Sequence, residues 1–137
     1  METSSGAAIA SVDETVVVGR RFVDALIAHD WAAIADCFEP GARFLAVVAN
    51  EKAPFREKIG GQAAAEQIAR WFGDGDVTEL IDSSVEPMVD RVKIVYRVHE
   101  HEPDGWYVVE QLAYVTPGNS GFARMNLACS GFRPVPA

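Results

Sequence analysis

The chain has 137 residues and a formal net charge of −8, with 49% hydrophobic and 23% charged residues. This length and composition predict one soluble globular domain with a sizeable core. The acidic balance disfavours nucleic acid and anionic membrane surfaces as partners, because both are bound by clustered Lys and Arg. No apolar run approaches the ~20 residues that a membrane span needs, so we expect no membrane partner.

The first 12 residues are small and acidic, without the basic start and apolar core of a secretory signal. We interpret residues 1–12 as a flexible tail and residues 13–134 as a single domain. Only Cys37 and Cys129 are present, and two cysteines make no disulfide framework. We therefore expect a cytoplasmic protein. No Cys-x-x-Cys pair or spaced Cys/His set indicates a structural metal, and we expect neither metal nor cofactor.

Three helices are expected in the first half of the chain. Apolar residues from Val16 to Ile27 recur at three- and four-residue steps, which predicts an amphipathic helix with Asp13 as its N-cap. A second, short helix is expected over residues 31–38, ended by the Pro-Gly pair that follows it. A third is expected over residues 62–72, which are rich in strong helix formers.

The expected strands follow in an order that indicates the fold class. Residues 42–49 form a strand candidate, and residues 50–61 are expected to be a polar loop. Four consecutive strand-like runs then cover residues 77–89, 91–102, 106–116 and 122–132. Helices first and an antiparallel meander last predict an α+β domain, in which three N-terminal helices pack on a curved, mostly antiparallel sheet.

Three segments carry a resemblance to a known family. They are "RFVDALIAHDWAAIADCFEPGARF" (21–44), "GGQAAAEQIARWF" (60–72) and "GFARMNLACSGFRP" (121–134). With this element order, the chain resembles the NTF2-like superfamily, especially its SnoaL-like and ketosteroid-isomerase-like branch. The resemblance implies a conical barrel with a deep apolar central pocket and a homodimer formed through the outer face of the sheet. It implies no single reaction, because the superfamily contains isomerases, dehydratases, cyclases, epoxide hydrolases and non-catalytic binders.

The catalytic groups of the isomerase branch are absent. Phe22 stands at the position that resembles the catalytic tyrosine, and Ala46 at that of the proton-abstracting aspartate. The hydrogen-bonding aspartate of the long strand would fall near Leu112. We therefore do not expect the ketosteroid-isomerase mechanism. The epoxide-hydrolase pattern is also incomplete, because Arg97 is followed at the second position by His99 rather than by an aspartate.

The turn after Glu102 decides which side chains face the pocket. Pro-Asp-Gly favours a type I turn with a glycine bulge at Gly105, which places Val98 opposite Glu110. A two-residue Asp-Gly turn is the alternative and would place His99 opposite Glu110. The favoured register gives a pocket face of Ile94, Tyr96, Val98, Val108, Glu110, Leu112, Tyr114, Met125, Leu127 and Cys129. The opposite, outer face would contain Arg97, His99, His101, Gln111, Arg124 and Asn126, and would form the dimer.

Glu110 is the only carboxylate on this expected pocket face. Removal from water disfavours the charged form, so we expect a raised pKa and an acid–base role for Glu110. Tyr96 and Tyr114 lie nearby in this register and are expected to hydrogen-bond Glu110 or a substrate oxygen. The alternative is a structural glutamate, bonded to a tyrosine hydroxyl, a backbone amide or an arginine of a second chain.

The expected ligand-binding residues are mostly apolar or aromatic, with one arginine for a carboxylate or oxyanion. They are Phe22, Leu26, Phe44, Arg56, Trp71, Leu112, Met125, Leu127 and Cys129. These residues predict a pocket for a small, largely apolar, oxygenated molecule. If the protein is catalytic, we expect a cofactor-independent lyase, isomerase or cyclase. The alternative is a non-catalytic module for ligand binding or dimerisation.

Overall fold

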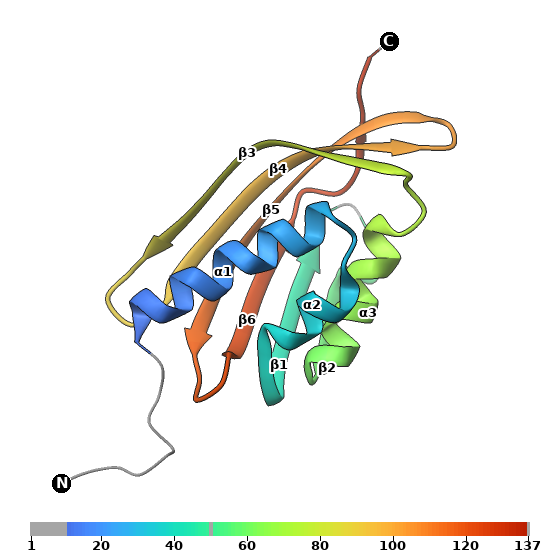
Figure 1. Ribbon diagram of the computed structural model, residues 1–137. Coiled ribbons are helices and arrows are strands. Elements are labelled where there is room, and N and C mark those ends of the chain that lie inside the picture. Colours follow the sequence, from blue (N-terminus) through green and yellow to red (C-terminus); the bar gives the residue numbers. More distant parts are fainter. Residues whose placement is uncertain (1–10, 50, 137) are drawn as a thin grey trace, which may run out of the picture.

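The computed structural model describes residues 11–49 and 51–136, and three helices lie on one face of a seven-stranded sheet (Figure 1). Residues 1–10 of the expected tail lie outside the described residues. Residues 11 and 12, the rest of that tail, instead begin the first helix. No helix in the described part of the chain is long and apolar enough to cross a membrane.

The first helix, α1 (Val12–Ile27), begins with a capping box. The Ser11 hydroxyl accepts a hydrogen bond from the Glu14 N–H at 3.0 Å, and the Glu14 carboxylate accepts one from the Ser11 N–H at 2.8 Å. Two otherwise unpaired N–H groups are thereby satisfied. The predicted N-cap, Asp13, lies inside the first turn instead. The buried side of α1 includes Phe22 and Leu26.

The other two helices lie beside β1 and β2 (Figure 1). The short helix α2 (Trp31–Asp36) is capped by the Asp30 carboxylate, which accepts from the Ala33 N–H at 3.1 Å. It ends before residue 38, because β1 begins there and passes through the Pro-Gly pair, with Gly41 at φ 77°. The helix α3 (Gly61–Phe72) matches the expected segment to within one residue.

The sheet is open and mixed. Its strands follow the order β2-β1-β6-β5-β4-β3, with β7 paired to β5. The strands are β1 (Phe38–Val48), β2 (Phe55–Ile59), β3 (Val77–Pro87), β4 (Val92–Glu102), β5 (Gly105–Pro117), β6 (Phe122–Cys129) and β7 (Arg133–Pro134). The β1–β6 pair is parallel and the other paired strands are antiparallel. The expected loop over residues 50–61 therefore contains an edge strand, β2, which has no fully buried side chain to reveal it in the sequence.

Aromatic side chains fill much of the space between the helices and the concave side of the sheet. The ring of Phe22 lies 6.4 Å from that of Phe38 and 6.2 Å from those of Tyr96 and Phe122, measured between centroids. Phe22, Tyr96 and Phe122 are fully buried. Full burial of a large apolar side chain contributes roughly 1.5–3 kcal/mol, so this cluster is a main source of stability.

The β4–β5 hairpin has neither of the two registers considered from the sequence. Its loop is Pro103–Asp104, and Glu102 pairs directly with Gly105. Pro103, in the loop, has its φ fixed at roughly −65° by its ring. Gly105 adopts φ 134°, a conformation that favours glycine, and it pairs with Glu102 as the first residue of β5 instead of forming a bulge. Arg97 therefore stands opposite Glu110 and Tyr96 opposite Gln111.

This one-residue difference reverses the faces of β5, because successive side chains of a strand point to opposite sides. The side-chain orientations predicted for β4 and β6 are confirmed. The inward side chains are buried, namely those of Ile94, Tyr96 and Val98 on β4 and of Met125, Leu127 and Cys129 on β6. On β5 the buried residues include Gln111, for which an outer position was predicted, together with Val109, Ala113 and Val115. Val108, Glu110, Leu112 and Tyr114 lie on the outer face instead, where a pocket face was predicted.

Candidate functional site

The three predicted catalytic residues do not come together. Glu110 lies on the outer face with its side chain 48% exposed, and its Oε2 is 3.5 Å from Nη2 of Arg97. Tyr114 lies on the same outer face, whereas Tyr96 is fully buried on the concave side. The prediction that Glu110 is a desolvated carboxyl in the pocket is wrong. An exposed ion pair of this kind contributes about 0–1 kcal/mol.

The predicted ligand-binding residues divide between the two faces. Most belong to the buried interior: Phe22, Leu26, Phe44, Met125, Leu127 and Cys129. Trp71 is half-buried at the end of α3 and lines two surface hollows. Leu112 lines a hollow on the outer face, so the prediction that it faces the interior pocket is wrong. Arg56, which was predicted to bind a ligand carboxylate or oxyanion, lines the same outer hollow.

A row of neutral polar groups crosses the concave side of the sheet. Tyr96 donates its hydroxyl hydrogen bond to Oε1 of Gln111, and Cys129 pairs with Gln111 across the next strand. Burial raises the pKa of the Tyr96 phenol well above its usual range and raises that of the Cys129 thiol. Both groups therefore stay neutral at physiological pH. Nε2 of Gln111 has no partner at ordinary hydrogen-bond distance among the described residues, but the Gln111 amide lies close enough to the Cys129 thiol to lower its pKa in part.

Glu100 is a fully buried carboxyl farther along the concave side of β4. Its Oε2 accepts a hydrogen bond from the Thr78 hydroxyl at 2.6 Å, and Oε1 has no partner within the described part of the chain. Burial raises the pKa of Glu100 to about 7. The Thr78 bond lowers this pKa in part, and the charges of Glu102 and Asp76 raise it. Glu100 thus has the environment that was predicted for Glu110.

The loop between α3 and β3 lies directly over the Glu100 carboxyl. A Cβ atom at Gly75 would lie 1.8 Å from Oε1 of Glu100, so only glycine allows this close approach. The Gly75 N–H donates to the Phe72 carbonyl at 3.2 Å. Oδ1 of Asp76 lies 2.7 Å from Nδ1 of His101, which ties the far end of the loop to β4. Glu100 is therefore separated from solvent by a short loop rather than by core packing alone.

A hollow of about 360 Å³ opens next to this loop. It is lined by Trp71, Glu102, Asp104, Tyr107 and Phe132. Glu102 lies two residues beyond Glu100 on β4, which corresponds to ~7 Å along a strand. A second hollow of about 270 Å³ shares Trp71 and Phe132. These two aromatic residues therefore line both hollows at this end of the concave side, where Glu102, two residues beyond Glu100, is also exposed to the first of them.

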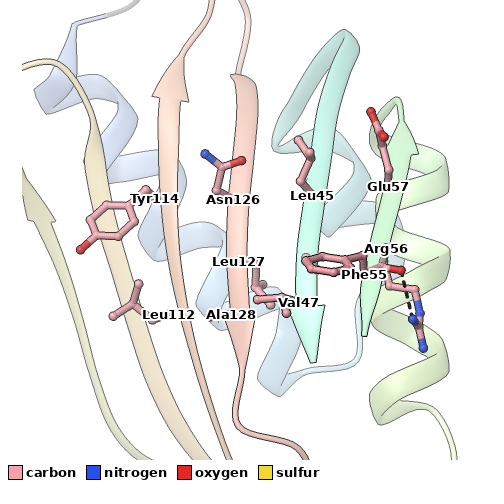
Figure 2. Close-up of a pocket in the computed structure, with 11 residues that line it drawn as sticks. Leu45, Val47, Phe55, Arg56, Glu57, Leu112, Tyr114, Asn126, Leu127 and Ala128 are labelled. Atoms are coloured by element: carbon pink, nitrogen blue, oxygen red, sulfur yellow. Dashed lines mark hydrogen bonds between the residues drawn. The ribbon is translucent and has the colours of Figure 1, made fainter. Parts of the chain in front are cut away.

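The outer face of the sheet has a separate, larger hollow of about 650 Å³ over β1, β2, β5 and β6 (Figure 2). Its lining is mostly apolar: Leu45, Ala46, Val47, Phe55, Leu112, Leu127 and Ala128, with Arg56, Glu57, Tyr114 and Asn126. Phe55 is 78% exposed, although it is a large apolar side chain. Arg56 forms an ion pair with Glu51 and donates to the carbonyls of residues 53 and 55. Its two terminal nitrogens are therefore already engaged beside this outer hollow.

Comparisons with known proteins identify the fold. No family model matches the chain. No curated protein matches it either. Among solved structures, a proposed polyketide cyclase from Xanthomonas campestris pv. campestris has a TM-score of 0.66 at 19% identity, over 86% of this chain and 92% of that one. A proposed SnoaL-like polyketide cyclase from Shewanella putrefaciens has a TM-score of 0.65 at 12% identity, over 85% and 90% of the two chains. An NTF2-like protein from Burkholderia xenovorans has a TM-score of 0.64 at 12% identity, over 88% and 92%.

The chain has the NTF2-like fold. The expected α+β architecture is thus confirmed, with an open rather than closed sheet. Likeness at this level of identity shows the fold alone, because proteins with this fold differ widely in chemistry. The chemistry of the present chain must be argued from its own buried groups.

Sequence reasoning missed Glu100, although a signal for it was present. Ile94, Tyr96 and Val98 alternate inward on β4, and the next inward position is Glu100. Thr78 and His29 gave no such signal, because their contact with this strand depends on long-range packing. Gln111 was assigned to the wrong face for the same reason as Glu110, namely the register of the hairpin.

Proposed function

We propose that the concave side of the sheet binds a small, largely apolar, oxygenated molecule and that Glu100 acts on it as a general acid or base. The observation that carries the proposal is a buried carboxyl with one oxygen unpartnered among the described residues, next to an aromatic-lined hollow. The reaction class that fits is a cofactor-independent isomerisation, elimination or cyclisation, in which a proton moves to or from carbon or oxygen.

The environment of Glu100 suits both directions of proton transfer. A carboxyl whose pKa is about 7 is about half protonated at neutral pH, so it can donate or accept a proton. As a base, its carboxylate takes a proton from a carbon next to a carbonyl group, and the C–H electron pair moves toward the carbonyl oxygen. As an acid, it returns that proton to another atom.

The entrance restricts the charge of the ligand. Glu102 and Asp104 line the hollow beside Trp71 and Phe132, and the whole chain carries a net charge of −8. An anionic ligand would be repelled here. The aromatic side chains favour a flat apolar body. We therefore propose a neutral or cationic ligand, and we no longer assign ligand carboxylate binding to Arg56.

A ligand reaches Glu100 in this proposal when the loop over residues 73–76 moves. Gly73 and Gly75 give this segment backbone freedom, and residues 73, 74 and 76 are exposed. To open, the loop must release the contact of Asp76 with His101 and lift the buried Gly75 off Glu100. Closure of the loop would then exclude water from the reacting carboxyl.

A generic proton-abstraction substrate tests the proposal without knowledge of the natural one. 5-Nitrobenzisoxazole opens to a coloured phenolate when a base removes its ring proton. We expect the wild-type protein to open it faster than buffer, with a rate that rises through about pH 7. Glu100→Gln should reduce the rate at least about tenfold, as expected for loss of a general base. Glu110→Gln, the matched control on the outer face, should leave the rate within twofold. Equal rates for wild type and Glu100→Gln would contradict the proposal.

We also propose that a second copy of the chain covers the outer hollow. The observation that favours a homodimer is the mostly apolar lining over β1, β2, β5 and β6, with Phe55 largely exposed. Apolar patches of this kind mark interaction sites in soluble proteins. In this proposal Leu112 and Tyr114 serve the contact between copies rather than ligand binding. A dimer without turnover would correspond to the non-catalytic alternative.

A further inference from the structure

Three polar side chains from distant parts of the sequence form a continuous line. Nε2 of His29, in the turn between α1 and α2, lies 2.6 Å from the hydroxyl of Thr78 on β3. The same hydroxyl lies 2.6 Å from Oε2 of Glu100 on β4. His29 is half-buried, whereas Glu100 is fully buried. The line therefore leads from the edge of the molecule to the interior carboxyl.

The hydroxyl group couples the protonation of the two ends. Thr78 has one proton to donate and lone pairs to accept with. When Glu100 is ionised, Thr78 donates to it and must accept from a protonated Nε2 of His29. When Glu100 is protonated and donates to Thr78, the hydroxyl proton turns toward His29, whose Nε2 must then be unprotonated.

We propose that His29 and Glu100 share one proton through Thr78, so that His29 exchanges protons between solvent and the enclosed carboxyl. In the forward step the Nε2 proton of the His29 imidazolium moves to Oγ1 of Thr78. The hydroxyl proton of Thr78 moves at the same time to Oε2 of Glu100. Imidazolium and carboxylate become neutral imidazole and carboxylic acid, with no change in total charge. The role of the relay rests on the proposed function. The relay would return a proton to Glu100 while the loop over residues 73–76 stays closed.

The local structure holds His29 in place for this contact. His29 has φ 55°, in the left-handed region where non-glycine residues are strained. Its ring stacks on Trp31 with centroids 5.0 Å apart and planes 21° apart. A glycine would end α1 without this strain. The backbone conformation of His29 and its stacking on Trp31 together hold the imidazole ring against the Thr78 hydroxyl.

The charged neighbours of Glu100 favour the proton on the carboxyl. Glu102 on β4 and Asp76 on the covering loop disfavour a further negative charge, which raises the pKa of Glu100. Asp76 is itself bound to His101. Tyr107, opposite Glu100 on β5, donates to Asp104, and this bond raises the pKa of the Tyr107 phenol. Tyr107 therefore stays neutral, and His29 is the basic group in line with Glu100.

The test uses ¹⁵N-labelled histidine in the full chain and follows the His29 ring nitrogens by NMR from pH 8 to pH 5. The relay predicts that a neutral imidazole protonated at Nδ1 and bare at Nε2 appears as Glu100 takes up its proton. Thr78→Ser keeps the hydroxyl and should retain this tautomer. Thr78→Val, an isostere without the hydroxyl, should lose it and show a direct change from the Nε2–H form to imidazolium.

The matched control is Glu110→Gln, which removes a carboxyl on the outer face and should leave the His29 signals as in wild type. A wild-type His29 curve that coincides with that of Thr78→Val would overturn the relay. This readout needs no substrate. Failure of the benzisoxazole test with the tautomer present would therefore reject the proposed function and leave the relay intact.

Discussion

The burial of Glu100 should make the stability of the protein depend on pH in a defined window. Its pKa is 4.5 in an exposed glutamate and about 7 in the folded protein. Between these values the folded state holds a proton that the unfolded chain has released, so the free energy of unfolding falls as pH rises. At ~1.4 kcal/mol for each pH unit, the loss is about 3 kcal/mol by pH 8 and absent below pH 4.5.

Glu100→Gln removes the titrating group while keeping its shape and an oxygen that can accept from Thr78. The wild-type free energy of unfolding should decrease by about 3 kcal/mol between pH 4.5 and pH 8 relative to that of Glu100→Gln. Glu110→Gln should show the wild-type slope, because Glu110 is exposed beside Arg97 and its removal leaves the Glu100 site unchanged.

Urea unfolding at pH 4.5, 6 and 8, followed by circular dichroism, measures this difference directly. The comparison within each pH cancels the titration of all other groups. Wild-type and Glu100→Gln stabilities that run parallel across the window would refute the reasoning, since the carboxyl would then be ionised in the folded state at little cost.

Two further variants test the loop and the outer face. Gly75→Ala introduces a Cβ that would lie 1.8 Å from the Glu100 carboxyl, so either the loop or the Glu100 side chain must shift. Because Glu100 is buried and bonded to Thr78, the free energy of unfolding should fall by about 1–3 kcal/mol, and unchanged urea unfolding would contradict this close approach. Leu112→Asp places a charge in the outer hollow and should convert a dimer into a monomer in light scattering, whereas Glu110→Gln beside it should remain dimeric. A monomeric wild type would remove the second-copy proposal.

The helices were predictable from the sequence because their signals are local. The apolar period of α1 and the strong helix formers of α3 decide each segment without reference to the rest of the chain. The inward faces of β4 and β6 were predictable for the same reason, since alternation within a strand is local. The edge strand β2 was missed, because it pairs only with β1 and has no continuous apolar face.

The candidate site was harder to predict because it depends on one turn. The position of Gly105 in the strand rather than in a bulge moves Glu110 out and Gln111 in. No feature of β5 itself decides between the two, since both faces contain apolar and polar residues. Extending the β4 alternation to Glu100 would have found the buried acid without the hairpin register. The contact of Thr78 with His29, 49 positions apart, follows only from the assembled fold.

We expect Glu100, and not Glu110, to be the desolvated acid of this protein. The most direct test of this expectation is a carboxyl-carbon NMR titration, with Glu100→Gln and Glu110→Gln used to assign the two signals. The account predicts a pKa of about 7 for Glu100. A Glu100 signal that titrates at or below 4.5, the value for an exposed glutamate, would contradict this assignment.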